Sequence, residues 1–267
     1  MKRMKKVLVL AAIAVLIFSG CSKVQGGQAA SQPEKKTINI SAAASLKNVM
    51  AEIEEKYENE FAQTDIVFNF GGSGALQTQI EEGAPVDIFF SAGSKQIKEL
   101  DEKALIKKGS IRTFLGNQIV AIKPRGSEIK IKSIEDLERE DIAKIGYSDP
   151  KLAPAGQYAS EAITYYHMEE KLSSKTILSS DVKTTLSWAE MGEIDLGFVY
   201  STDAMDNEKV ETAFIVDEAS HSKIEYPVAI IDSSQNFKEA EAFIEYMETS
   251  GTLDIFEKYG FSVKRKE

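Results

Sequence analysis

Short segments in which hydrophobic and polar residues alternate are separated by stretches with apolar residues at helical spacing. Residues 37–42 alternate as in a strand, and apolar residues then recur at helical spacing after Ser45. The order continues with a strand predicted over residues 65–70, a helix from Ala75, a strand over 86–91 and a helix near 95–105. Strand–helix–strand units with short connections need right-handed crossovers, so this half of the pattern predicts a mainly parallel sheet covered by helices.

A second series of the same kind follows. It comprises a strand over residues 117–123, a helix over 133–140 capped by Ser133, a strand over 143–149, helices beginning at Ala155 and Val182, strands over 194–200 and 225–231, and amphipathic helix over 237–258. Two such series in one chain predict two lobes, with residues 117–123 and 225–231 as the crossover strands. We therefore expect lobe 1 to comprise residues 37–118 and 226–267, and lobe 2 to comprise residues 119–225.

The N-terminal residues predict a targeting signal rather than a part of the fold. Four basic residues precede an unbroken apolar run over residues 7–18, which is shorter than the about 20 residues that a membrane-spanning helix needs. The Ser-Gly-Cys that ends at Cys21 resembles the lipobox of bacterial lipoproteins, although Phe18 stands where leucine is usual. We expect removal of residues 1–20 as a signal peptide and acylation of Cys21; ordinary cleavage nearby, which would leave a free thiol, is the alternative.

The amino-acid composition and net charge exclude some classes of binding partner. Residues 21–36 are polar and rich in Gly, Gln and Ser, which predicts a flexible tether. Loss of residues 1–20 would remove four of the 32 basic residues and none of the 42 acidic ones, so the net charge would change from −10 to −14. That balance argues against binding to nucleic acid and against electrostatic attachment to anionic lipid. Cys21 is the only cysteine, so no disulfide can support the fold.

Five positions lie where a predicted strand ends or a predicted helix begins, which is where open α/β sheets bind ligands. They are Ser45, the glycine-rich loop 71–74, Ala155, Val182 and Tyr200. Glycines let backbone N–H groups approach a ligand closely, serines add hydroxyls, and helix N-termini favour negative charge. Together the five predict a site between the lobes for a tetrahedral oxyanion held by neutral donors. Plain turn chemistry is the alternative for any one Ser/Gly loop.

The loop 71–74 does not match the nucleotide-binding motifs. A P-loop needs a Lys-Ser/Thr pair after its glycines, whereas Gly74 is followed by Ala-Leu-Gln. A dinucleotide fingerprint needs a third glycine, and Gln77 occupies that position. Neither motif is present.

A serine hydrolase is an alternative from another class. Ser73 lies in a near match to the nucleophile elbow, with Ala75 in place of the last glycine. His221 follows Ser73 in the chain with Asp203 and Asp217 between them, an order that a catalytic triad permits. Such an order arises easily by chance, so we favour a hydrogen-bonding role for His221 at the interface of the lobes and expect no enzymatic activity.

The sequence also contains a tyrosine pair of the kind that ferric-ion-binding proteins use. Tyr165 and Tyr166 are followed by His167. Helical spacing from Tyr158 instead predicts Tyr166 in the core and Tyr165 at the surface, with His167 exposed on the helix. No cluster of His, Cys and carboxylate residues in the sequence suggests a better metal site.

Five longer segments resemble one known family. They are SAAASLKNV (41–49), FGGSGALQTQIEEGAPVDIFFSA (70–92), SDPKLAPAGQYASEAI (148–163), LGFVYSTDA (196–204) and HSKIEYPVAII (221–231). In combination they resemble the molybdate-binding proteins of molybdate ABC transporters, over about residues 37–261. The resemblance implies a type II periplasmic binding protein with two α/β lobes, each a mainly parallel sheet flanked by helices, joined by two crossover strands. It implies no cofactor, because molybdate is the ligand.

The resemblance also assigns the binding residues. Molybdate or tungstate would be held, with no direct metal ligand, by the hydroxyls of Ser45 and Ser73, the backbone N–H groups of Ala155 and Val182, and Tyr200. The loop contains one serine where some relatives have more, so Ser73 is the one side-chain contact expected from it. Lys183 is the nearest candidate for a countercharge, and we expect its side chain to point into solvent.

These inferences define one expected function. We expect a monomeric, extracytoplasmic receptor, anchored to the cell membrane by lipid on Cys21, that captures molybdate and also tungstate and delivers the anion to the permease of an ABC importer. A sulfate or phosphate receptor of similar architecture is the alternative. Phosphate recognition usually needs a carboxylate that accepts the ligand's proton, and none stands among the five positions.

Overall fold

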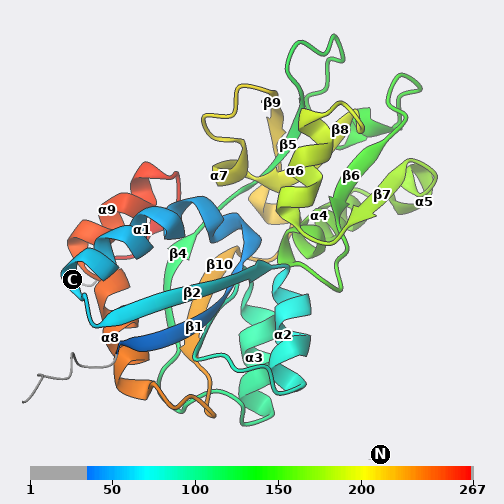
Figure 1. The fold of residues 1–267 in the computed structure, drawn as a ribbon. Helices are drawn as coiled ribbons and strands as arrows, with labels where there is room; N and C mark the ends of the chain where they lie inside the picture. The colour runs from blue at the N-terminus through cyan, green and yellow to red at the C-terminus, as the bar shows by residue number, and fades with distance from the viewer. Residues whose placement is uncertain (1–34, 266–267) are drawn as a thin grey trace, which may run out of the picture. The chain divides into compact units, whose positions relative to one another are not determined.

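Two β-sheets flanked by helices make up residues 35–265, the part of the chain that the computed structural model describes (Figure 1). The first sheet has the strand order β11-β4-β10-β3-β1-β2. Its strands are β1 (Lys36–Ala43), β2 (Thr64–Gly71), β3 (Ile88–Phe90), β4 (Arg112–Gly116), β10 (Glu225–Ile230) and β11 (Ser262–Val263). β1 pairs in parallel with β2 and β3, and the pairs that involve β4, β10 and β11 are antiparallel.

The second sheet has the order β7-β6-β8-β5-β9. Its strands are β5 (Ile119–Pro124), β6 (Ile145–Ser148), β7 (Thr176–Ser179), β8 (Leu196–Tyr200) and β9 (Val210–Ile215). β6 is parallel to β7 and β8, whereas β5 is antiparallel to β8 and β9. Both sheets are therefore mixed rather than mainly parallel as expected. The chain leaves the first sheet along β4 and returns along β10, and it enters the second sheet along β5 and leaves along β9, so the strands of each pair run in opposite directions.

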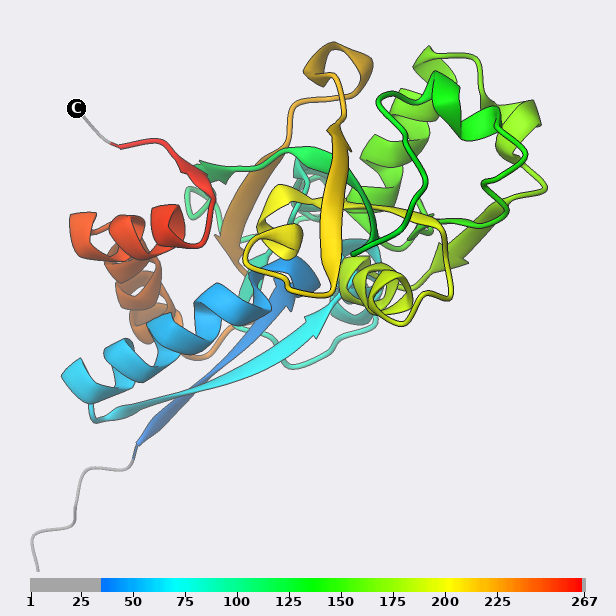
Figure 2. The same cartoon turned by 90° about the horizontal axis from the view of Figure 1, so that it is seen from above.

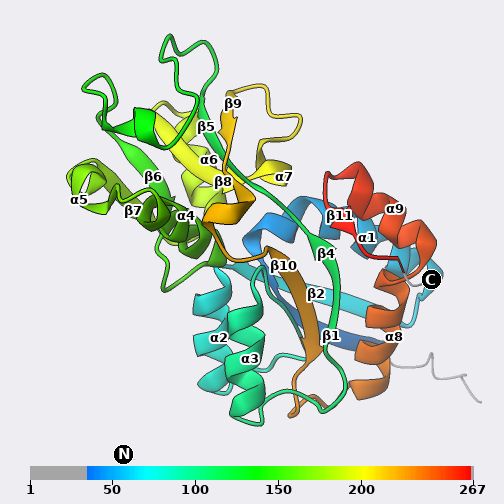
Figure 3. The ribbon, with the colours of Figure 1, turned by 180° about the vertical axis from the view of Figure 1, so that it is seen from behind.

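The chain passes between the sheets twice. The outgoing passage, residues 117–118, joins β4 to β5, and the return passage, residues 216–224, joins β9 to β10. Figure 3 shows β4 and β10, which pair with each other, leading toward the second sheet. The crossover strands predicted over residues 117–123 and 225–231 correspond to β5 and β10, which directly follow the two passages.

Helices cover both faces of the first sheet. The described helices are α1 (Lys47–Glu60), α2 (Ser73–Glu81), α3 (Ser94–Glu102), α4 (Pro154–Tyr165), α5 (Glu169–Leu172), α6 (Val182–Glu190), α7 (Ser201–Ala204), α8 (Phe237–Met247) and α9 (Ser250–Lys258). The short 3-10 turns are η1 (Ala44–Leu46), η2 (Glu135–Glu138) and η3 (Glu218–Ser220). None of the helices within residues 35–265 has the length and apolar character that a bilayer span requires.

Alternation along β3 divides the first lobe's core between two faces. Phe89 packs in a cluster with Leu76 and Ile80 of α2, whereas Phe90 packs in the main cluster with Val49 of α1. Successive strand residues point to opposite faces, so one short apolar strand supports helices on both sides. Figure 2 shows α1, α8 and α9 gathered on one side of this sheet.

Several predicted elements differ from the structure. The helix expected over residues 133–140 is only the turn η2, and Ser133 does not cap it, since the residue that precedes the turn is Ile134. The helix expected over 237–258 is two helices, because the Thr249 hydroxyl donates to the carbonyl of Tyr246 (2.8 Å) where α8 ends. β4, β7, β9 and β11 were not predicted. Residues 1–20, Cys21 and the tether up to residue 34 lie outside the described residues.

The expectation for Lys183 is wrong. Its Nζ lies 2.7 Å from Oδ1 of Asp203, and the side chains of Lys183 and Asp203 are 24% and 0% exposed. Burial raises the pKa of the Asp203 carboxyl above its ordinary value, and the Lys183 ammonium partly opposes that increase. The ion pair joins the first turn of α6 to α7, so the lysine neutralises a buried carboxylate instead of pointing into solvent.

Removing the lysine should therefore destabilise the fold more than neutralising the aspartate. Lys183→Ala leaves a buried carboxylate without its cation, and it should lower the melting temperature by more than Asp203→Asn does. The loss should stay below the about 3–5 kcal/mol typical of a fully buried pair, because the lysine is partly exposed. A carboxyl with a raised pKa takes up a proton as pH falls, so the deficit of Lys183→Ala should shrink in acid.

Thermal unfolding of both variants and of the double variant at several pH values provides the measurement. Asp203→Asn added to Lys183→Ala should recover part of the lost stability, because it removes the unpaired charge. Equal melting temperatures for wild type and Lys183→Ala at neutral pH would contradict a stabilising pair.

Candidate anion-binding site

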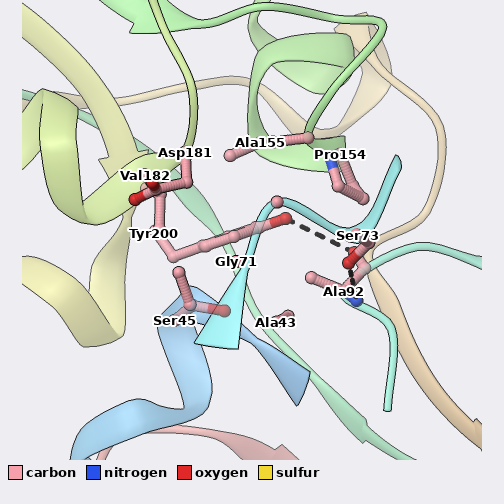
Figure 4. A pocket seen from close by; sticks show the side chains of 13 residues that line it. Ala43, Ser45, Gly71, Ser73, Ala92, Pro154, Ala155, Asp181, Val182 and Tyr200 are labelled. Atoms are coloured by element: carbon pink, nitrogen blue, oxygen red, sulfur yellow. Dashed lines mark hydrogen bonds between the residues drawn. The ribbon is translucent and has the colours of Figure 1, made fainter. Parts of the chain in front are cut away.

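One small cavity is lined by segments from both sheets (Figure 4). Its empty volume, including its open side, is about 200 Å³. The lining residues are Ala43, Ala44, Ser45, Gly71, Gly72, Ser73, Ala92, Ala153, Pro154, Ala155, Asp181, Val182 and Tyr200. The structure thus brings all five residues that the sequence singled out together at one cavity.

The first sheet contributes two serines at the carboxyl ends of its strands. Ser45 lies in η1 directly after β1, and Ser73 is the first residue of α2, two residues earlier than the helix was predicted to begin. Ser73 is fully buried, and its Oγ accepts a hydrogen bond from the backbone N–H of Ala92 (3.1 Å). A backbone N–H can only donate, so the proton of the Ser73 hydroxyl remains available to another acceptor.

The second sheet contributes two helix N-termini. Ala155 lies in the first turn of α4, and Val182 is the first residue of α6. The first N–H groups of a helix have no acceptor within the helix, and the helix dipole adds partial positive charge there. The carboxylate of Asp181 caps α6 by accepting from the N–H groups of Lys183 (2.9 Å) and Thr184 (3.1 Å). Asp181 does not accept from the N–H of Val182, so that N–H group is available to a ligand in the cavity.

Tyr200 reaches across from the second sheet to the first. The residue is 1% exposed, and its hydroxyl donates to the carbonyl oxygen of Ala92 (3.3 Å), a contact visible in Figure 4. Tyr158 donates to the same oxygen (3.4 Å). Burial raises the pKa of Tyr200 well above its ordinary value, so the phenol keeps its proton and remains a donor.

Ala92 is the residue at this site that sequence reasoning missed. Its N–H orients Ser73 and its carbonyl accepts from Tyr200. It lies just past the carboxyl end of β3, so the rule that selected the other positions also applies to it. An alanine offers only backbone groups, however, and nothing in its side chain signals a role.

The electrostatic character of the cavity comes from neutral donors. Among the described residues that line it, Asp181 is the one ionisable carboxylate and no lysine or arginine is present. Asp181 is committed to its helix cap, and Lys183 to Asp203. The arrangement can bind an anion by hydrogen bonds, and it holds no carboxylate placed to accept a proton from a protonated ligand.

Two contacts between the lobes close one side of the cavity. The backbone N–H groups of Gly74 (2.7 Å) and Ala75 (3.2 Å) donate to the carbonyl of Leu152. A Cβ on Gly72 would lie 2.5 Å from the Leu152 oxygen, and one on Gly74 would lie 2.4 Å from the carbonyl oxygen of Lys151. Real Cβ atoms do not approach so closely, so the two glycines permit the lobes to meet here.

The structure does not assemble the alternative sites. Nδ1 of His221 lies 2.8 Å from the carbonyl oxygen of Ser222, so its hydrogen bond is local rather than between the lobes, and His221 does not line the cavity with Ser73. Asp217 caps η3 instead of orienting a histidine. Within residues 35–265, no group of three or more His, Cys, Asp or Glu side chains is placed to hold a metal ion.

The tyrosine pair has the placement that helical spacing predicted. Tyr165 is 56% exposed, and Tyr166 is partly buried against the core. His167 is exposed as expected, but it follows the end of α4 with a φ of 57° instead of lying within the helix. The two tyrosine rings pack edge to face against each other, with 5.2 Å between their centroids.

Comparisons with known proteins agree on one family. The family model for bacterial extracellular solute-binding proteins matches residues 38–262. YvgL of Bacillus subtilis, which carries the name of an ABC transporter substrate-binding lipoprotein, is 37% identical over 97% of this chain and 98% of its own length. The molybdate-binding protein ModA of Haemophilus influenzae is 33% identical over 99% of this chain and 100% of its own.

Solved structures agree as well. A substrate-binding domain named for a molybdenum ABC transporter of Clostridium difficile is 39% identical, with a TM-score of 0.65 over 87% of this chain and 100% of that one. Its similarity extends over both sheets, which confirms the two-lobed α/β fold that the sequence predicted. The chain belongs to the bacterial extracellular solute-binding protein family, and its homologues include the molybdate-binding proteins.

Proposed function

We propose that the protein is the molybdate receptor of an ABC importer and that it also takes tungstate. One observation carries the proposal: a small cavity into which neutral hydrogen-bond donors from both lobes converge without a cation. The names of the homologous molybdate-binding proteins support the choice of ligand. The family's role in solute binding supports a receptor rather than an enzyme.

In this proposal five groups hold the oxyanion. Their sources are the hydroxyls of Ser45, Ser73 and Tyr200 and the backbone N–H groups of Ala155 and Val182. A dianion leaves water only when its oxygens are met by donors, and hydrogen bonds to charged groups are the stronger ones. Tyr200 would transfer its hydrogen bond from the Ala92 carbonyl to the ligand.

Selectivity follows from the kind of donors. Molybdate and tungstate present only acceptors at neutral pH, whereas phosphate retains a proton that needs an acceptor. Asp181, the carboxylate at the cavity, is occupied by the N–H groups of α6. The site therefore favours fully deprotonated dianions over phosphate. Sulfate is also fully deprotonated and is the alternative ligand.

Loss of one donating hydroxyl should weaken binding measurably. A hydrogen bond to a charged group contributes about 1.5–3 kcal/mol, so Ser73→Ala should weaken molybdate binding roughly ten- to a hundredfold. Calorimetric titration of wild type with molybdate, tungstate, sulfate and phosphate, and of the variant with molybdate, provides the measurement. Ser262→Ala, at an exposed serine on β11, is the matched control. Wild type that binds phosphate as tightly as molybdate would overturn the proposed ligand.

Closure of the lobes should depend on the glycines of the loop. Gly74→Ala places a Cβ against the Lys151 carbonyl, so the lobes should not reach their closed arrangement and molybdate should bind at least tenfold more weakly. Small-angle scattering should show compaction on adding molybdate to wild type and less compaction of the variant. Gly251→Ala in α9, where an added Cβ meets nothing within 4 Å, should behave as wild type. Equal compaction of Gly74→Ala and wild type would rule out this role.

We further propose that lipid on Cys21 anchors the receptor outside the membrane, from which it delivers its anion to a permease. The lipoprotein name of YvgL supports this. Cys21→Ser should release the protein from the membrane fraction of expressing cells, while the purified soluble protein binds molybdate as before. A variant that remains in the membrane fraction as firmly as wild type would exclude the anchor.

A further inference from the structure

A chain of hydrogen bonds leads from the outgoing passage to Ser45 at the anion site. Nδ2 of Asn117 donates to the hydroxyl of Tyr226 (3.2 Å), and that hydroxyl lies 3.1 Å from Oγ of Ser45. Asn117 lies in the outgoing passage, and Tyr226 lies on β10, which follows the return passage. These hydrogen bonds therefore join both connections between the lobes to Ser45, which lines the cavity.

The partners of the Asn117 side chain fix which end of its amide is the oxygen and which is the nitrogen. This assignment sets the donor and acceptor at each later hydrogen bond. Oδ1 of Asn117 accepts from the backbone N–H of Gln118 (2.9 Å) and from the hydroxyl of Ser201 (2.9 Å). Its Nδ2 donates to Oγ1 of Thr202 (2.9 Å) and to Tyr226. An amide side chain has two protons and two lone pairs, and all four are used here. Because the Gln118 N–H can only donate, it must face the amide oxygen, so Nδ2 must face Tyr226.

The orientation of the Asn117 amide also bears on the hydroxyls of Tyr226 and Ser45. The Tyr226 hydroxyl accepts a hydrogen bond from Nδ2 of Asn117. Its own buried proton needs an acceptor, and Ser45 Oγ lies within hydrogen-bonding distance, so we infer that Tyr226 donates to Ser45. Tyr226 is 0% exposed, and burial raises its pKa well above the ordinary value, so its proton is retained. Ser45 accepts from Tyr226, and its remaining proton is available to the cavity. A serine turned the other way would present a lone pair to an anion, which is repulsive.

Ser45 and Ser73 thus reach the same state by different means. The backbone N–H of Ala92 fixes Ser73. A side-chain hydroxyl fixes Ser45. Asn117 in addition holds Ser201 and Thr202, which directly follow Tyr200, so the same amide supports site residues of both lobes.

We propose that Tyr226 and Asn117 are positioning residues that keep the Ser45 hydroxyl a donor toward the bound oxyanion. The inference rests on the proposed function, because it assumes that Ser45 binds the anion. Neither residue lines the cavity, so both act through Ser45. The recognition of a small anion then depends on the segments that connect the lobes.

A double-mutant cycle between Tyr226 and Ser45 tests the proposal. Tyr226→Phe keeps the ring that packs beside Tyr200 (5.6 Å between centroids) and removes only the hydroxyl. It should weaken molybdate binding about five- to thirtyfold, which corresponds to about 1–2 kcal/mol. In the Ser45→Ala background the same change should alter binding less than about twofold, because Tyr226 then has no serine to orient. Tyr57→Phe, at another buried tyrosine on α1, should leave binding unchanged.

A variant that replaces the hydrogen-bond donor at Asn117 with an acceptor gives a second test. Asn117→Asp replaces the donor that faces Tyr226 with an acceptor, so the tyrosine proton should turn away from Ser45 and binding should fall at least as much as in Tyr226→Phe. Gln118→Glu adds the same charge on an exposed side chain and keeps the backbone N–H that donates to Asn117, so it should cost less than about threefold. Thermal unfolding without ligand checks that each variant is folded.

The outcomes separate this inference from the proposed function. Wild type that does not bind molybdate, or Ser45→Ala that binds it as wild type does, would overturn the proposed site itself. Normal binding by wild type and weakened binding by Ser45→Ala, together with additive losses in the cycle or wild-type binding by Asn117→Asp, would overturn only the positioning role.

Discussion

The hydrogen bond from the N–H of Gly74 to the carbonyl of Leu152 determines how closely the two lobes approach at the cavity. It places the N-terminus of α2, with Ser73, opposite the first turns of α4 and α6. The contact is possible because two glycines present no side chain to the facing carbonyl groups. The contacts that cross the site between the lobes, including the reach of Tyr200 to Ala92, depend on this separation.

The cavity offers an anion hydrogen-bond donors but no unpaired cation. Each ionic group near it already has a partner: Asp181 caps α6, and Lys183 pairs with Asp203. What remains for a ligand is a set of dipoles whose directions are fixed by the backbone or by buried side chains. Such donors need little rearrangement when an anion arrives, and they offer nothing to a ligand that must itself donate a proton.

The sequence predicted the elements of the site better than it predicted their connections. Ser45, Ala155 and Val182 could be found because strand ends and helix starts are local features with a general relation to binding. The ion pair of Lys183 could not, because it depends on how α7 packs against α6. The partners of the serines, Ala92 and Tyr226, lie 19 and 181 residues away from them in the chain, a separation that no local pattern reports.

The errors in the fold have similar causes. β4 and β9 are short and antiparallel, and they adjoin the passages between the sheets, so they lack the strand–helix alternation that revealed the parallel strands. Ser133 precedes acidic residues typical of a helix start, yet the segment forms only η2. Local propensity proposes a helix there, and tertiary packing decides its length.

The shared acceptor at Ala92 has a consequence for unloading. Tyr200 and Tyr158 both donate to its carbonyl oxygen. If Tyr200 turns its hydrogen bond to an anion, Tyr158 still satisfies that buried oxygen, and Tyr200 can later return to an acceptor already in place. Neither exchange leaves the buried carbonyl oxygen of Ala92 without a donor, a loss that would cost about 1–3 kcal/mol. The carbonyl of Ala92 is therefore an acceptor that Tyr200 can leave and rejoin while Tyr158 keeps it paired.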